Sequence, residues 1–130
     1  MNRVLVIEDD ELILRIIEKT LSKEDMAVET ASNGKEALLR LEEADYNFQV
    51  IITDIMIPYA NGLEIVSKVK GRNKGKQVSV IIISNASNEE VMADAFKLGV
   101  DDFLKKPFSP AELLTTVRRL VTQHSETGPS

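Results

Sequence analysis

Acidic side chains that directly follow short apolar runs have the clearest chemical potential in this sequence. Glu8, Asp9 and Asp10 follow one such run, and Asp54 follows another. Two ionised carboxylates about 4–5 Å apart repel by roughly 3–4 kcal/mol at an effective dielectric near 20, so a group of them needs a cation. Oxygen ligands alone suit a hard divalent ion, and Mg²⁺ is the one we expect. The alternative for any single acid is a helix cap or a solvent-facing side chain.

A hydroxyl and an ammonium end two further apolar runs. Ser84 ends a run of β-branched residues, and Lys105 and Lys106 precede Pro107 after the last run. A carboxylate beside a divalent cation can attack a phosphoryl group and form an acyl phosphate. Such a transfer depends mainly on positioning and on neutralising the charge of the phosphoryl oxygens. Asp54, Ser84 and a lysine supply the nucleophile, the hydroxyl donor and the cation for this chemistry.

Five short runs are expected to place these residues together as strands. The third and fourth are nearly continuous in β-branched residues, which is typical of strands buried on both faces of a parallel sheet. The second alternates more and is typical of an edge strand. In chain order the runs are Val4–Ile7, Met26–Ala31, Val50–Thr53, Val78–Ile83 and Asp102–Lys105.

Helical patterns fill the gaps between the runs. Apolar residues recur at helical spacing over 12–21 and 113–121. Four helix starts carry Ser or Asn three residues before Glu, which is capping-box spacing or its Asn analogue. Gly99 is a candidate C-terminal stop. The four pairs are Asn33 and Glu36, Asn61 and Glu64, Ser87 and Glu90, and Ser109 and Glu112.

The order is therefore strand then helix, five times over. Parallel strands joined by helices need right-handed crossovers. This predicts an α/β fold, a doubly wound five-stranded parallel sheet with helices on both faces. The ligand site of such a sheet lies beyond the carboxyl ends of its strands, which is where the acids, Ser84 and the lysines stand.

Composition limits the classes of protein to which the chain can belong. A length of 130 residues suits one domain, and an apolar fraction of 43% suits a packed core. The absence of cysteine excludes disulfides and thiolate chemistry. The net charge of −5 argues against direct nucleic acid binding. No apolar run approaches the roughly 18 residues of a membrane span, so we expect a soluble cytoplasmic protein.

Five segments in combination resemble the receiver domain of bacterial two-component response regulators, of the single-domain chemotaxis or sporulation-regulator type. The resemblance spans Arg3 to about Thr122. We therefore expect a receiver domain over residues 1–123 and a flexible tail or linker over 124–130. The segments are Val4–Asp10, Ile51–Pro58, Asn61–Glu64, Ile81–Ser84 and Gly99–Phe108.

The resemblance implies a flavodoxin-like (βα)5 fold with strand order 2-1-3-4-5. Asp54 aligns with the phosphoacceptor of the family. Glu8 and Asp9 align with the acidic pair that holds Mg²⁺ together with Asp54, and Met56 aligns with the residue that adds its backbone carbonyl to the metal. Lys106 aligns with the lysine of a Lys-Pro pair whose peptide bond is usually cis.

The resemblance also implies a switch. Ser84 aligns with the hydroxyl that follows the phosphoryl group, and Phe103 aligns with an aromatic that rotates into the space left by that hydroxyl. The surface of the fourth helix, fifth strand and fifth helix would then change shape. The alternative for Phe103 is an ordinary half-buried strand aromatic.

The partners that the resemblance implies are those of a signalling switch, not of an enzyme acting on a separate substrate. A sensor histidine kinase or a histidine phosphotransfer protein would supply the phosphoryl group from a phosphohistidine. A downstream effector protein or an output domain would receive the signal. The chain's own reactions would be limited to self-phosphorylation and self-dephosphorylation.

Four positions bear on how this chain differs from other members of the family. Asn85 stands where a small residue is usual, and could crowd Asp54 or hydrogen-bond the phosphoryl group. Neither Met56 nor Ala86 can position a water molecule, which predicts a long-lived phosphorylated state. Thr116 follows Glu112 where regulators with winged-helix output carry Arg, so their mode of dimerisation is not expected.

Two other functions compete with this interpretation. A pseudo-receiver would bind partners without phosphorylation, although the complete acidic set and Lys106 argue against it. A Mg²⁺-dependent phosphohydrolase of haloacid-dehalogenase type also uses an Asp nucleophile at a strand end. That family requires Asp-x-Asp, and Met56 stands at the second Asp position.

Overall fold

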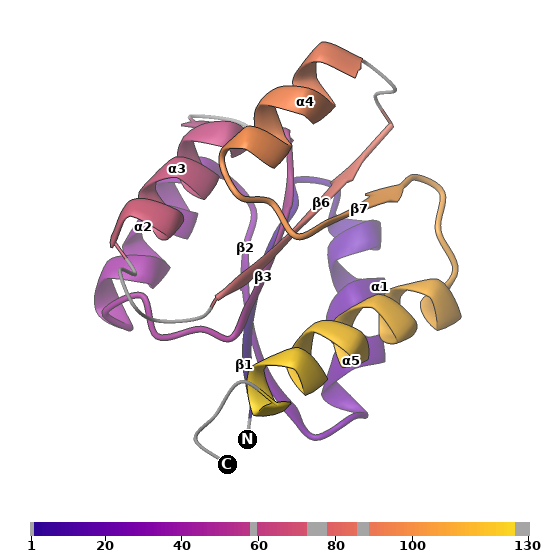
Figure 1. Cartoon of the computed structure of the whole chain (residues 1–130). Coiled ribbons are helices and arrows are strands. Elements are labelled where there is room, and N and C mark those ends of the chain that lie inside the picture. Colours follow the sequence, from indigo (N-terminus) through magenta and orange to yellow (C-terminus); the bar gives the residue numbers. More distant parts are fainter. Residues whose placement is uncertain (1, 58–59, 73–77, 86–88, 127–130) are drawn as a thin grey trace.

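A single twisted parallel sheet forms the centre of the molecule (Figure 1). The computed structural model describes residues 2–57, 60–72, 78–85 and 89–126. The strand order is β2-β1-β3-β6-β7, which is the flavodoxin-like order 2-1-3-4-5 when the strands of this sheet are counted along the chain. The strands are β1 (Asn2–Ile7), β2 (Met26–Ala31), β3 (Val50–Asp54), β6 (Ser79–Ser84) and β7 (Asp102–Lys105).

The predicted runs coincide with these strands to within a residue or two at each end. β2 lies at one edge of the sheet, as its alternating pattern indicated, and β3 and β6 lie inside it. Every residue of β3 and β6 is buried. The continuous β-branched character of these two runs therefore matches burial on both faces.

In the part of the chain that the structure describes, five helices cover the two faces of the sheet (Figure 1). Strand residues alternate between the faces, so two separate apolar cores form. One core, on what we call the α2–α3–α4 face, contains Ile7 and Ile82, and the other, on the α1–α5 face, contains Val6 and Ile83. The helices are α1 (Glu11–Ser22), α2 (Gly34–Glu43), α3 (Gly62–Arg72), α4 (Glu89–Lys97) and α5 (Pro110–Glu126).

The predicted helix signals are largely confirmed. The Asn33 side chain accepts a hydrogen bond from the Glu36 N–H at 2.8 Å, and Ser109 and Glu112 form a reciprocal capping box. Gly99 has a φ of +101° just after α4, a conformation that favours glycine. The predicted cap at Ser87 lies outside the described residues.

Two features differ from the expectation. A short antiparallel hairpin, β4 (Met56–Ile57) with β5 (Ala60–Asn61), connects β3 to α3 and was not predicted. The helix α5 continues to Glu126, three residues into the segment expected as a tail. Two-residue strands carry no periodicity that a sequence pattern could reveal. Among the described residues, no helix is long and apolar enough to cross a bilayer.

Candidate functional site

Asp54 occupies the carboxyl end of β3, one of the inner strands, and is 7% exposed. Its Oδ1 accepts a hydrogen bond from the backbone N–H of Met56 at 3.0 Å. Its Oδ2 accepts one from the Lys106 ammonium at 2.6 Å. Both carboxylate oxygens are thus held in place, and the side chain has a defined orientation at the end of the sheet.

Gly62 lets the chain pass close to this strand end. A Cβ atom at position 62 would lie 2.4 Å from the backbone oxygen of Asp54 and 2.7 Å from the Cα of Ile55. Because both neighbours are backbone, no side-chain movement could relieve the clash. The Gly62 N–H also donates to the Ile55 carbonyl at 2.8 Å. Glycine at this position therefore fixes the connection that follows Asp54, a requirement that the sequence analysis missed.

Glu8 and Lys106 complete a buried charge cluster with Asp54. Glu8 is 0% exposed at the end of β1, and its Oε1 forms an ion pair with the Lys106 ammonium. That oxygen nevertheless accepts no hydrogen bond of good geometry from the described residues. One ammonium is therefore shared by two buried carboxylates, which leaves the cluster with one negative charge in excess.

The pKa values of the cluster reflect this crowding. Burial and the nearby Asp54 charge raise the pKa of Glu8 above its usual range, although Lys106 opposes the shift. Burial alone would lower the pKa of Lys106, but the hydrogen bonds and charges of Asp54 and Glu8 outweigh it and raise that pKa. Lys106 is therefore a firmly charged ammonium at neutral pH.

Strand alternation explains why these three side chains meet. Glu8, Asp54 and Lys106 each stand two residues after a residue of the α1–α5 core, namely Val6, Ile52 and Leu104. All three side chains therefore belong to the same face of the sheet. The neighbouring Lys105 is exposed and, one residue along the chain, belongs to the opposite face. The peptide bond between Lys106 and Pro107 is cis.

The other two residues predicted to hold the metal, Asp9 and Met56, have exposed side chains, and Asp10, which was not predicted as a ligand, caps a helix. Asp9 is exposed and lines a polar hollow of about 240 Å³ between α1, β2 and α2. Asp10 caps α1, with its Oδ1 accepting from the Ile13 N–H at 3.1 Å. The Met56 side chain is 74% exposed. Within the described part of the chain, no three acidic or histidine side chains surround a common point.

Ser84 and Phe103 share the other face of the sheet. Ser84 is 2% exposed at the end of β6 and pairs in register with Lys105. Phe103 lies two residues earlier on β7, packs against the α2–α3–α4 core, and its ring centroid is 6.2 Å from that of Phe96 on α4. Ser84 and Phe103 are thus diagonal neighbours, as a coupled pair would need.

A hollow of about 360 Å³ opens beside the charge cluster on the α1–α5 face. Lys106 lines it, and so does Asn85, the residue that follows Ser84. Apolar side chains of α1 and the segment after β7 form the rest of its wall, together with Asp10; they are Ile13, Ile16, Pro107 and Phe108.

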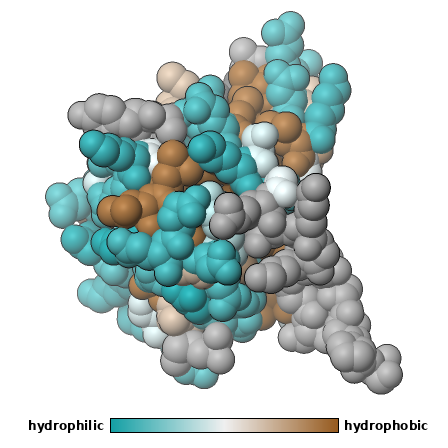
Figure 2. Space-filling model, turned by 90° about the vertical axis from the view of Figure 1, so that its left-hand side faces the viewer, coloured by the Kyte–Doolittle hydropathy of each residue, from teal (hydrophilic) through white to brown (hydrophobic). Residues whose placement is uncertain are grey.

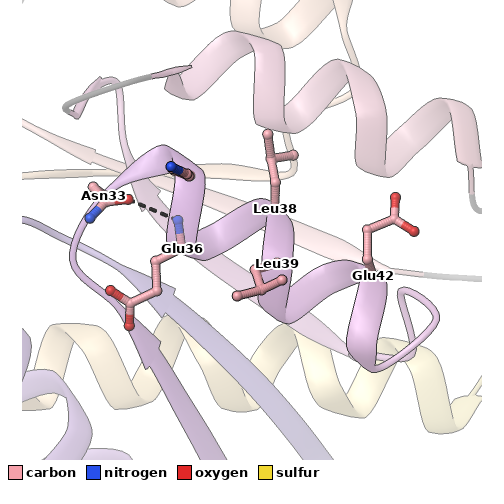
Figure 3. A pocket seen from close by; sticks show the side chains of 6 residues that line it. Asn33, Glu36, Leu38, Leu39 and Glu42 are labelled. Carbon is pink, nitrogen blue, oxygen red and sulfur yellow. Dashed lines mark hydrogen bonds between the residues drawn. The ribbon is translucent and has the colours of Figure 1, made fainter.

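A larger hollow, about 470 Å³, lies along α2, outside the charge cluster (Figure 3). Leu38, Leu39 and Glu42 line it from one side of the helix, and Leu39 is 59% exposed. Space-filling Figure 2 shows that apolar patches interrupt an otherwise hydrophilic surface on the side of the molecule that it presents. None of the lining side chains is a residue of the charge cluster.

Comparison with known families identifies one match that covers most of the chain. The family model described as "Response regulator receiver domain" matches residues 4–118. Among curated proteins, the transcriptional regulatory protein ResD of Bacillus subtilis is 31% identical over 126 residues, and SrrA of Staphylococcus aureus is 31% identical over 127. Each alignment covers 97% of this chain and 50% of the relative, so the chain spans about half the length of these curated relatives.

Solved structures of similar proteins have the same fold. The chemotaxis response regulator CheY4 of Vibrio cholerae has a TM-score of 0.81 and 30% identity, covering 92% of this chain and 98% of its own. A CheY-like receiver domain protein of Methanospirillum hungatei has a TM-score of 0.90 and 25% identity, covering 98% and 99%.

Proposed function

Because the chain belongs to the receiver domains of two-component response regulators, we propose that it is a switch operated by phosphorylation of Asp54. The observation that carries the proposal is the Asp54 carboxylate itself. It lies at the carboxyl end of an inner strand, with Oδ1 on a backbone N–H and Oδ2 on the Lys106 ammonium. A carboxylate so oriented is prepared for attack, and the ammonium is prepared to neutralise the incoming charge.

The proposed reaction transfers one phosphoryl group. A carboxylate oxygen of Asp54 forms a new O–P bond while the P–N bond of a donor phosphohistidine breaks. The electron pair of that bond returns to the imidazole, whose other ring nitrogen carries a proton, so neutral histidine leaves. Hydrolysis ends the signal when a water oxygen bonds to phosphorus, the bond to Asp54 breaks, and inorganic phosphate departs.

The residues of the cluster fit a divalent cation. Glu8 Oε1 is a buried carboxylate oxygen without a well-formed hydrogen bond, and the cluster carries excess negative charge. Oxygen donors alone suit Mg²⁺, and we propose Glu8, Asp9, Asp54 and the Met56 backbone carbonyl as its ligands. A bound Mg²⁺ would neutralise phosphoryl oxygens during transfer. Asp9 has to reorient for this role, because its side chain is exposed.

Ser84 and Phe103 are proposed as the moving parts. The Ser84 hydroxyl would follow the phosphoryl group, and the Phe103 ring would turn towards the space that it leaves. Phe103 touches Phe96 of α4, so its rotation would change a contact on the surface of α4, β7 and α5. Phosphorylation then shifts the population between two packings.

The proposed partners follow from this chemistry. A sensor histidine kinase or a histidine phosphotransfer protein would supply the phosphoryl group in the cytoplasm. An effector protein or output domain would respond, and the relatives named as transcriptional regulatory proteins are about twice as long as this chain. We propose a long-lived phosphorylated state, since the Met56 side chain cannot activate water; Ala86, the other position in that prediction, lies outside the described residues.

Intact-mass spectrometry with acetyl phosphate tests the proposal. The wild-type chain should gain a single phosphoryl group with Mg²⁺ and none with a chelator. Asp54→Asn should gain none. Asp25→Asn is the matched control, because Asp25 is an exposed turn residue with a φ of 59°, a conformation that Asn tolerates. Modification of Asp54→Asn, or none of the wild type, would refute Asp54 as phosphoacceptor.

A further inference from the structure

We propose that Asn33 is a site of spontaneous deamidation and that Asn61 is protected from the same reaction, independently of the function proposed above. Asparagine precedes glycine at two positions of the sequence, Asn33-Gly34 and Asn61-Gly62. In such a pair the glycine nitrogen attacks the side-chain amide readily, because the second residue has no Cβ atom to obstruct the approach. The sequence alone gives both pairs the same reactivity, so only the folded structure distinguishes them.

The reaction proceeds through a succinimide ring. The Gly34 nitrogen loses its proton and forms a bond to Asn33 Cγ, while the bond from Cγ to the amide nitrogen breaks and ammonia leaves with a proton. Water then opens the ring at one of its two carbonyl groups. Opening at Cγ gives aspartate, and opening at the main-chain carbonyl gives isoaspartate, whose backbone runs through Cγ. The reaction consumes one water and releases one ammonia, without oxidation or reduction.

The two asparagine side chains are held alike. Asn33 Oδ1 accepts a hydrogen bond from the Glu36 N–H at 2.8 Å, and Asn61 Oδ1 accepts one from the Leu63 N–H at 2.7 Å. Because these bonds are of the same kind, the side-chain amides do not account for a difference in reactivity. Exposure alone would favour reaction at Asn61, which is exposed, over Asn33, which is half-buried.

The nitrogen atoms of the two glycines have different surroundings. The Gly62 N–H donates to the Ile55 carbonyl at 2.8 Å. Gly62 also lies close against the end of β3, since a Cβ atom there would be 2.4 Å from the Asp54 backbone oxygen. Its nitrogen is free to attack Asn61 only after this connection detaches from the strand, which is a local unfolding event. The fold therefore protects Asn61.

The Gly34 N–H is not held in this way. Gly34 is the first residue of α2, and the first N–H groups of a helix have no partner within the helix. It donates no hydrogen bond to another of the described residues. Asn33 lines the hollow along α2, where water reaches the ring that forms (Figure 3). Reaction at Asn33 therefore needs movement of the first turn of α2 alone, and the sheet stays intact.

The two products of the reaction have opposite effects on α2. Aspartate at position 33 keeps an oxygen that accepts from the Glu36 N–H, and it adds a negative charge at the positive end of the helix dipole. Isoaspartate lengthens the backbone at the cap position, so its carboxylate no longer lies over the first turn and the cap is lost. Deamidation of Asn33 therefore changes both the charge and the stability of the beginning of α2.

Peptide mapping of the folded chain during incubation in a mildly alkaline buffer tests the proposal. Mass spectrometry detects the replacement of an amide by a carboxylic acid, and chromatography separates the two isomers. The rate at Asn33 should exceed the rate at Asn61 by about tenfold or more, since detaching Gly62 breaks a backbone hydrogen bond and its packing. In urea, where both pairs are unfolded, the two rates should agree within about threefold.

Two variants separate the chemistry from the fold. Gly34→Ala places a Cβ atom beside the attacking nitrogen at a helical position that alanine adopts, and should slow the reaction at Asn33 about tenfold both in the folded chain and in urea. Asn33→Ser keeps a good helix cap without an amide. It should remove the modification from this peptide and leave the urea midpoint near the wild-type value.

Three results would overturn the proposal. The first is a reaction at Asn61 in the folded chain that is as fast as the reaction at Asn33, or faster. The second is a folded chain in which neither residue reacts although both react in urea, since the helix cap would then protect Asn33 as well. The third is an unchanged rate at Asn33 in Gly34→Ala, which would exclude ring closure through the Gly34 nitrogen.

Discussion

Two lysine–aspartate pairs lie at opposite ends of the sheet, and their surroundings differ. At the carboxyl end, Lys106 pairs with Asp54, and both side chains are 10% exposed. At the amino end, Lys70 of α3 pairs with Asp101 at 3.0 Å, and these side chains are 27% and 33% exposed. The same two residue types thus form a buried pair at one edge and a partly hydrated pair at the other.

In the pair at the amino end, the charges balance and both side chains also form hydrogen bonds with the backbone. The Lys70 ammonium also donates to the Val78 carbonyl at 2.8 Å, and Asp101 Oδ2 also accepts from the Val80 N–H at 2.7 Å. These bonds join α3 and the segment before β7 to the beginning of β6. One positive and one negative charge cancel, and each also satisfies a backbone group. This pair therefore serves the fold.

The pair at the carboxyl end is unbalanced. Glu8 adds a second carboxylate to the same ammonium, and one of its oxygens has no well-formed hydrogen bond. Buried like charges lower the stability of the fold. A protein that keeps them usually does so because the site has a function. The excess of buried acid, not the ion pair as such, therefore distinguishes the candidate site from the pair at the amino end. Removal of an acidic side chain should consequently lower the free energy of unfolding at the amino end and raise it at the carboxyl end.

The largest expected effect is that of Lys106→Met. It leaves two buried carboxylates without their cation, so the free energy of unfolding should fall by about 3 kcal/mol in a chelating buffer. Urea unfolding followed by circular dichroism measures it. Lys105→Met is the matched control, because Lys105 is adjacent but exposed. Equal effects of the two substitutions would show that the buried acids do not depend on Lys106.

Asp101→Ala should have the next largest effect. It leaves the buried Val80 N–H without its acceptor and Lys70 without its counter-charge, so the free energy of unfolding should fall by about 2 kcal/mol. Phosphorylation of Asp54 by acetyl phosphate should remain at the wild-type rate. Asp94→Ala, at an exposed position of α4, controls for the loss of a surface acid. A slower phosphorylation would mean that the two ends of the sheet are coupled.

Substitution of an acid in the candidate site should instead raise the free energy of unfolding. Asp54→Asn and Glu8→Gln each remove one of two competing negative charges and leave Lys106 with a single carboxylate. The free energy of unfolding should rise by about 1 kcal/mol in the chelating buffer. Urea unfolding of Asp54→Asn beside Asp101→Ala gives the comparison directly. If Asp54→Asn and Glu8→Gln lowered the free energy of unfolding as Asp101→Ala does, the two pairs would not differ in this respect.

The sequence predicted the framework of this comparison because its signals are local. β-branched runs identify buried strands, capping pairs identify helix starts, and Asp54 directly follows a strand. The flavodoxin-like order and the family came from a resemblance over several segments, which the family match confirms. Those signals sufficed to place Glu8, Asp54 and Lys106 at one edge.

The details of the site depend on contacts between distant residues, which no local signal encodes. Lys106 and Asp54 are 52 positions apart, and only the folded sheet decides that Lys106 also binds Glu8. Asp9 and Asp10 are chemically alike, yet Asp10 caps α1 while Asp9 is exposed. Likewise, no local signal indicates that Asp101 accepts a hydrogen bond from the Val80 N–H, a residue 21 positions away.

The smallest expected effect is a pH dependence that separates Glu8 from ordinary surface acids. The pKa of Glu8 in the folded chain is raised above the usual 4.5, so the folded state holds this proton more tightly than the unfolded state does. Its contribution to stability is therefore fully present below about pH 4.5. It is lost as the pH rises through the raised folded pKa. Surface acids in ion pairs have the opposite dependence, since their folded pKa values are lowered.

The difference between wild type and Glu8→Gln isolates this contribution, because all other acids cancel. In a chelating buffer, the stability gained by Glu8→Gln should be smallest near pH 4.5 and should grow towards neutral pH. Urea unfolding at intervals between these limits measures it. A gain that shrinks as the pH rises would mean that Lys106 stabilises ionised Glu8 more than burial and Asp54 destabilise it. The cluster would then be a balanced pair like that of Lys70 and Asp101.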